Sequence, residues 1–134
     1  MRRLRLAAPL ALLLAGCQTD QQAAPSAQPP DARAAIVAAK GLLYKDPDSI
    51  KGASITAPRR HMGFMWHVCV RANAKNAFGG YTGERDMLIG LYDDGKPPSV
   101  IMANGAGYCD FPHEPFHELD GGYQPPKQAG KPKA

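Results

Sequence analysis

The sequence predicts an α+β fold in which one N-terminal helix packs on a small antiparallel sheet of three to four strands. Apolar residues between positions 31 and 46 recur at the spacing of an amphipathic helix, whereas residues 64 to 72 and 85 to 92 alternate as strands do. Segments rich in Gly, Asn and Pro separate the strands, as expected for turns. A helix followed by such a meander forms a two-layer unit.

The helix is expected to start after Asp31, a favourable N-cap that follows two prolines. Its apolar stripe consists of Ile36, Ala39, Leu42 and Leu43. Because Pro47 disfavours helical geometry in the preceding residue, the helix should end near Asp46. A turn follows, and a short strand is expected over residues 53 to 57.

The predicted strand over residues 64 to 72 places alternate side chains on opposite faces of the sheet. One face carries Phe64, Trp66, Val68 and Val70, and the other carries Met65, His67, Cys69 and Arg71. The apolar neighbours of Trp66 favour a core position over a ligand platform. In the strand from 85 to 92, Met87, Ile89 and Leu91 share one face. A third strand is expected over residues 99 to 103, and the prolines at 112 and 115 then predict an irregular loop.

The charge distribution argues against a nucleic-acid-binding surface. The 134 residues carry a formal net charge of +4, but Arg2, Arg3 and Arg5 lie in a segment expected to be removed, and three lysines lie in the C-terminal tail. Residues 31 to 123 hold 10 basic and 11 acidic residues. A near-neutral domain lacks a patch that could neutralise phosphates, so no nucleic-acid partner is expected.

The N-terminus is typical of an export signal. Its arginines precede an apolar run from Leu6 to Leu14, which is too short to span a bilayer but fits a secretory signal. The next residues, Leu14-Ala15-Gly16-Cys17, resemble the lipobox of bacterial lipoproteins. The resemblance implies cleavage before Cys17, a diacylglycerol thioether on its sulfur and acylation of the new amino group. Several acyl chains together hold a protein to a membrane almost permanently.

Gln18 stands where an aspartate would imply retention in the inner membrane, so the resemblance implies anchoring in the outer membrane, facing the periplasm. The expected organisation is then a signal peptide over residues 1–16, a lipidated cysteine and disordered tether over 17–30, a single α+β domain over 31–123 and a disordered tail over 124–134. The tether and tail are rich in Gln, Ala, Pro and Lys and cannot bury enough apolar surface to fold.

Two motifs within the predicted domain carry a second resemblance. The first is the turn Asp46-Pro47-Asp48-Ser49, and the second is the segment 68–83, which reads VCVRANAKNAFGGYTG. Together they resemble an uncharacterised group of small exported bacterial proteins that have a DPDS turn and a VCxxxNAKNxFGGYxG segment. The resemblance implies a shared architecture and an exported location, and it assigns no catalytic residue.

The cysteines predict a disulfide. With Cys17 assigned to lipid, Cys69 and Cys109 remain as a pair, and an oxidising compartment favours a bond between them. A catalytic thiolate is the alternative, with Cys69 beside His67, or Cys109 beside a later histidine. No cysteine-protease signature surrounds either residue, and one disulfide would consume both nucleophiles.

A metal site is the second alternative for this region. The potential ligands are Cys109, Asp110, His113, Glu114 and His117. Positions four apart share a face only in a helix, and the two prolines argue against a helix here. The sequence therefore predicts no metal and no cofactor.

Residues 73 to 83 are the strongest candidate for a contact surface. They lack the lysine-serine ending of a phosphate-binding loop and lie between two predicted strands rather than before a helix. A turn alone does not require two aromatic residues and a lysine. The candidate partner-contact residues are Asn73, Lys75, Asn76, Phe78 and Tyr81.

No set of titratable side chains converges in the sequence, so no catalytic residue is expected. The sequence predicts a non-catalytic, lipid-anchored envelope protein with a binding or structural role, whose partner would be another envelope protein. The alternative is a periplasmic inhibitor of a hydrolase that acts through residues 73 to 83. An enzyme would instead require a cleft that contains His67, Cys69 and a carboxylate.

Overall fold

The computed structural model describes residues 28–61 and 65–126. The predicted signal peptide, Cys17, Phe64, most of the tether and most of the tail lie outside the described residues. The described elements are α1 (Ala32–Leu43), η1 (Pro47–Ser49), β1 (Lys51–Thr56), β2 (Arg59–His61), β3 (Met65–Asn73), β4 (Arg85–Leu91), β5 (Ser99–Met102), β6 (His113–Pro115) and η2 (His117–Leu119). None of the helices in these ranges is both long and apolar enough to cross a membrane.

Helix α1 begins where the sequence predicts and ends a few residues earlier. The Asp31 side chain accepts a hydrogen bond from the backbone N–H of Ala34 (3.1 Å), which confirms the N-cap. The helix ends at Leu43 rather than near Asp46. Its buried residues are Ala32, Ile36, Ala39 and Leu43. The prediction for Leu42 is wrong: at 100° per residue it lies about 120° around the helix from Ile36, and it is 74% exposed.

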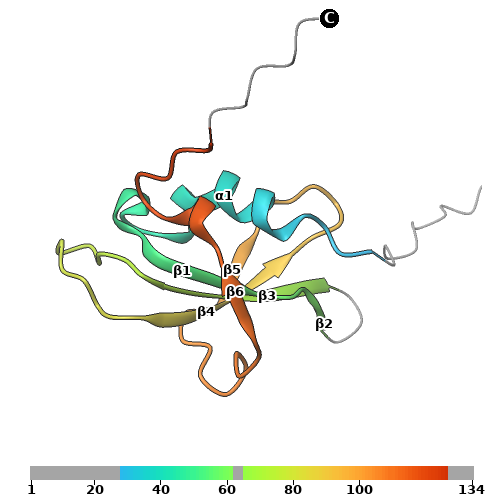
Figure 1. Cartoon of the computed structure of the whole chain (residues 1–134). Coiled ribbons are helices and arrows are strands. Elements are labelled where there is room, and N and C mark those ends of the chain that lie inside the picture. Colours follow the sequence, from blue (N-terminus) through green and yellow to red (C-terminus); the bar gives the residue numbers. More distant parts are fainter. Residues whose placement is uncertain (1–27, 62–64, 127–134) are drawn as a thin grey trace, which may run out of the picture.

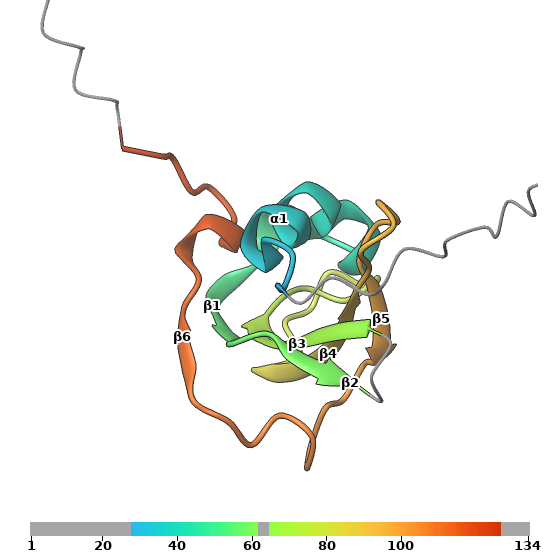
Figure 2. The ribbon, with the colours of Figure 1, turned by 90° about the vertical axis from the view of Figure 1, so that its right-hand side faces the viewer.

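The α+β class is confirmed, but the sheet has six strands rather than three to four. The strands pair antiparallel in the order β5-β4-β3-β1-β6, and β2 pairs with the start of β3, beyond the stretch that β1 covers. Helix α1 lies across one face of this sheet (Figures 1 and 2). Strands β2 and β6 were not predicted, because three residues are too few to show an alternation of apolar and polar side chains.

Strand β6 also contradicts the irregular loop predicted around the two prolines. It pairs with β1 at the edge of the sheet, with Pro115 opposite Ser54. An edge strand tolerates proline because one side of its backbone needs no partner. Immediately after β6, Phe116 is fully buried under α1, and its N–H donates to the carbonyl of Ala53 (2.8 Å). The predicted loop therefore contains an edge strand that leads directly to a core residue.

The alternation predicted for the two long strands is confirmed. The face of the sheet under α1 carries Val68, Val70, Ile89 and Leu91, with Trp66 and Met87 packed against this core. The opposite face carries a smaller cluster of Cys69, Leu88 and Cys109, against which Met102 packs. Trp66 thus belongs to the core side, as its neighbours predict.

Candidate functional site

The turn after α1 and the loop between β3 and β4 are hydrogen-bonded to each other through Ser49. Its Oγ donates to the carbonyl of Asp46 (2.7 Å) and accepts from the backbone N–H of Lys75 (2.8 Å). Its carbonyl accepts from the Tyr81 hydroxyl (3.1 Å). Ser49 is buried, whereas the loop itself is largely exposed. The DPDS turn and residues 73 to 83, here the 73–83 loop, are therefore parts of one structure.

Two of the predicted contact residues hold the shape of the 73–83 loop. The Oδ1 of Asn76 accepts from the N–H groups of Phe78 (3.0 Å) and Gly80 (3.1 Å), and the Oδ1 of Asn73 accepts from that of Gly83 (3.1 Å). The backbone N–H of Asn76 also donates to the carbonyl of Gly80 (2.9 Å). The amide oxygens of both asparagines are thus occupied inside the loop, which fixes its conformation.

The same loop exposes two aromatic side chains, and one of them, Tyr81, lies beside two lysines. The Phe78 side chain is 97% exposed, and Tyr81 is 45% exposed. The Nζ of Lys51 lies 3.8 Å from the centroid of the Tyr81 ring, and that of Lys75 lies 5.6 Å from it, both within cation–π range. We call Phe78, Tyr81, Lys51 and Lys75 the Phe78 surface. Sequence reasoning missed Lys51, because it is distant in the sequence and belongs to β1.

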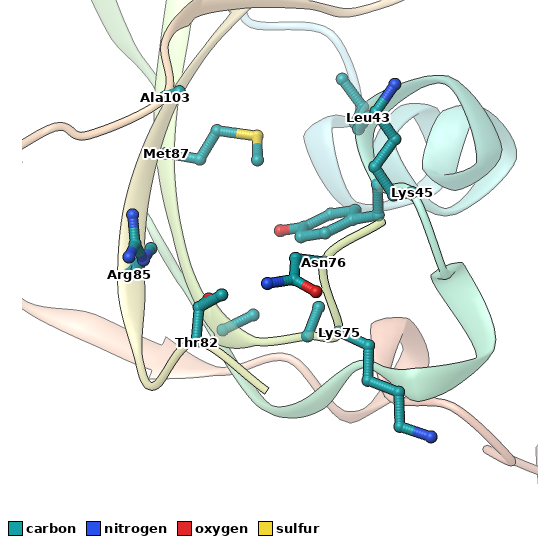
Figure 3. Close-up of a pocket in the computed structure, with 11 residues that line it drawn as sticks. Leu43, Lys45, Lys75, Asn76, Thr82, Arg85, Met87 and Ala103 are labelled. Atoms are coloured by element: carbon teal, nitrogen blue, oxygen red, sulfur yellow. The ribbon is translucent and has the colours of Figure 1, made fainter. Parts of the chain in front are cut away.

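A cavity of about 340 Å³ lies beside the loop, between the end of α1, the end of β3 and the start of β4 (Figure 3). Its floor is apolar and includes Leu43, Ala72 and Met87. Tyr44 and Arg85 also line it, so we call it the Tyr44–Arg85 pocket. Of the predicted contact residues, Lys75 and Asn76 line this pocket, whereas Asn73, Phe78 and Tyr81 do not.

Burial raises the pKa of Tyr44 to about 12. Removal of its proton would place a charge where water is scarce, which disfavours the phenolate. Tyr44 therefore remains a neutral hydroxyl, able to donate a hydrogen bond, throughout the pH range in which cells live. Neither Tyr44 nor Arg85 stood out in the sequence, because nothing in their local patterns indicates a pocket.

The disulfide between Cys69 and Cys109 is confirmed, with an S–S distance of 2.04 Å and Cα atoms 5.6 Å apart. Because both sulfurs are bonded to each other, neither cysteine can act as the thiolate of a nucleophile–histidine pair in this state. Cys109 is for the same reason not available as a metal-binding thiolate. The bond joins the 103–112 loop to the sheet face that is turned away from α1.

Three of the other candidate ligands, His113, Glu114 and His117, have partners elsewhere: Glu114 lies 3.7 Å from Arg33, and His117 lies 3.7 Å from Asp120. Arg71 donates two hydrogen bonds to Asp86 (3.0 and 2.9 Å), and this interaction raises the pKa of the guanidinium. In His113, Nδ1 lies 2.8 Å from the carbonyl of Phe111, and Nε2 lies 3.4 Å from Asp86. In the part of the chain that the structure describes, no group of three or more His, Cys, Asp or Glu residues is placed to hold a metal ion.

No family model, curated protein or solved structure matches this chain.

Proposed function

We propose that this chain is a lipid-anchored protein of the cell envelope, held to the outer membrane through Cys17, which binds a periplasmic protein partner through the Phe78 surface and catalyses no reaction. The observation that supports a binding role is the exposure of the Phe78 side chain. A side chain that is 97% exposed contributes almost nothing to the stability of its own fold. Its loop is nevertheless held by the hydrogen bonds of Asn76 and Ser49, so it is ordered before any partner arrives.

Preorganisation of this kind favours tight binding. A loop that is already rigid loses little conformational entropy when a partner closes over it. A projecting aromatic side chain can fill a pocket of the partner, and such anchors dominate interface energies. The lysines beside Tyr81 favour a partner whose rim is acidic.

The position of the loop suits an anchored protein. Figure 1 shows the 73–83 loop at one end of the domain and the start of α1, where the N-terminal segment enters, at the other. A domain tethered at the start of α1 can turn the Phe78 surface away from the membrane. We therefore place the partner in the periplasmic space rather than in the lipid.

Photocrosslinking in cells tests the contact. A benzophenone amino acid is placed at Phe78 and, as a control, at Tyr108, which is 57% exposed and lies in the 103–112 loop. We expect a discrete adduct from position 78 and none of the same mass from position 108. Phe78→Ala should leave the melting temperature within about 2 °C of the unchanged protein, since exposed substitutions rarely alter stability. Equal adducts from both positions would contradict the assignment.

The rigid loop also supports the second candidate, an inhibitor of a hydrolase, because inhibitors of this kind change little in shape on binding. The identity of the crosslinked protein separates the two. An adduct on active-site residues of a hydrolase, with loss of its activity, supports inhibition, whereas an adduct on a non-catalytic envelope protein supports a structural role.

The anchor is tested separately by mass spectrometry of the N-terminal peptide from native membranes. We expect a peptide that begins at Cys17 and carries acyl chains, and a Cys17→Ser variant that is released from the membrane fraction. An unmodified Cys17 would refute the anchor without affecting the crosslinking result.

A further inference from the structure

We infer that the Tyr44–Arg85 pocket binds a small ligand that carries a carboxylate on an apolar body. This inference goes beyond the proposed function and does not depend on it, because Lys75 is the one residue of the Phe78 surface that lines the pocket, and Phe78 and Tyr81 take no part in the lining. The pocket requires neither the lipid anchor nor a protein partner.

The size and floor of the pocket suit a compact apolar group. A volume of about 340 Å³ lies at the lower end of the range found for small-molecule sites. Leu43 and Ala72 are buried at its base, and Met87 is half-buried. Figure 3 shows the Met87 side chain extending across the cavity toward the end of α1. A methionine floor adapts readily to ligands of different shape.

Each polar side chain around this floor can donate a hydrogen bond, although the hydroxyls of Tyr44 and Thr82 can also accept one. The Tyr44 hydroxyl makes no hydrogen bond within the described residues and can donate one to a ligand. The Oδ1 of Asn76 is occupied by its own loop, which leaves the amide nitrogen free to donate. In Figure 3 this nitrogen is turned toward the side of the pocket where Thr82 and Arg85 lie.

The charges of the pocket are all positive. Arg85 lies on one side of the cavity, whereas the amino groups of Lys45 and Lys75 point away from it at the rim (Figure 3), and no carboxylate is among the 11 lining residues. Lys45, Lys75 and Arg85 form none of the ion pairs found in the described parts of the chain. Other basic residues, such as Arg71 and Lys40, do form ion pairs with carboxylates. Arg85 thus brings to the pocket a positive charge that no carboxylate among the lining residues offsets.

A carboxylate matches this set better than the other anions or a neutral group. The planar guanidinium of Arg85 can bind both oxygens of a carboxylate, and Tyr44 and Asn76 can donate to the remaining lone pairs. A cation would be repelled by Arg85, and an inorganic anion would leave the apolar floor exposed to water. Two sources offer this chemistry: the C-terminal end of an apolar peptide and a free carboxylic acid.

Titrations of the purified full chain, followed by backbone amide NMR, test the inference. The probes are 4-phenylbutyrate and its neutral analogue 4-phenylbutanamide, and N-acetyl-alanyl-leucine with a free or an amidated C-terminus. We expect each acid to bind at least tenfold more tightly than its amide, with shifts concentrated at residues 43–45, 74–76 and 85–87. Tighter binding of the peptide acid identifies a chain end as the natural ligand, and tighter binding of phenylbutyrate identifies a free acid.

Two arginine variants provide the matched comparison. Arg85→Gln should weaken binding of the preferred acid at least tenfold. Arg59→Gln removes the same charge from an exposed arginine that stacks on Phe111, outside the pocket, and should change binding less than twofold. Tyr44→Phe should weaken binding several-fold while keeping the shape of the pocket. Equal affinity for acid and amide, equal effects of the two arginine variants, or no shifts with any probe would each overturn the inference. None of these failures would alter the crosslinking expected at Phe78.

Discussion

Replacement of Ser49 by alanine should loosen the 73–83 loop as well as destabilise the domain. Ser49 is 9% exposed, and its Oγ makes two hydrogen bonds, to the carbonyl of Asp46 and from the N–H of Lys75. Loss of a buried partner costs about 1–3 kcal/mol, because the group left behind is neither bonded nor solvated. We therefore expect the free energy of unfolding to fall by about 2 kcal/mol. For a domain of this size, the melting temperature should fall by roughly 8 to 16 °C.

The assay combines urea unfolding, followed by circular dichroism, with amide hydrogen exchange. The matched control is Ser54→Ala, because Ser54 is half-buried and its hydroxyl makes no hydrogen bond in the described part of the chain. The control should change the free energy of unfolding by less than about 0.5 kcal/mol. Exchange at the Lys75 amide should accelerate in Ser49→Ala and remain unchanged in Ser54→Ala.

Two results would refute this reasoning. If both serine variants lose the same stability, the two hydrogen bonds contribute nothing beyond the removal of a hydroxyl. If Ser49→Ala is destabilised but the Lys75 amide stays protected, Ser49 supports the turn after α1 without supporting the 73–83 loop. In that case the rigidity on which the binding proposal depends would need another origin.

Three further perturbations follow from the structure. Replacement of both Cys69 and Cys109 by alanine should lower the free energy of unfolding by about 4 kcal/mol, measured by urea unfolding, since the bond joins residues 40 positions apart. Gly121→Ala should lower it by several kcal/mol, because a Cβ there would overlap the backbone of Asp48, and a melting curve like that of the unchanged protein would contradict the packing. Burial raises the pKa of Tyr44 in the folded protein to about 12. The buried, neutral side chain therefore contributes fully to stability below pH 10, and this contribution is lost as the pH rises toward 12. Tyr44→Phe should flatten that loss, which is on the order of 2 kcal/mol, in unfolding measured from pH 8 to 12.

The sequence predicted the long elements well because their periodicity reports burial directly. Val68 and Ile89 were assigned to one face of the sheet and Cys69 to the other, and both assignments hold. The helix cap at Asp31 was likewise predicted from residue type and position. These signals depend on residues that are close together in the sequence, so a single sequence is enough to predict them.

The missed strands depended on tertiary context instead. The prolines near β6 normally interrupt strands, and only the edge position makes them acceptable. The exposed Leu42 was misplaced for a similar reason: it is as apolar as Leu43, and the choice between them depends on which face meets the sheet.

The structure gives the conformation of the 73–83 loop, whereas its role as a contact surface stays a prediction. The 73–83 loop was recognised from its turn residues, yet asparagine can serve a turn or a partner, and only the hydrogen bonds decide. The pocket could not be predicted, because Tyr44 and Arg85 are far apart in sequence and neither belongs to a motif. A single sequence does not show which isolated residues come together in the folded protein.

The disulfide has a consequence for the order in which the molecule is completed. The segment that it holds leads directly into β6 and then to Phe116 and Leu119, which are the last residues along the chain in the core under α1. A thiol pair oxidises only outside the reducing cytosol. If the chain is exported as proposed, it would lack this covalent link while it is still in the cytosol and would be easier to unfold there. The disulfide would then form only after export, when the chain reaches an oxidising compartment.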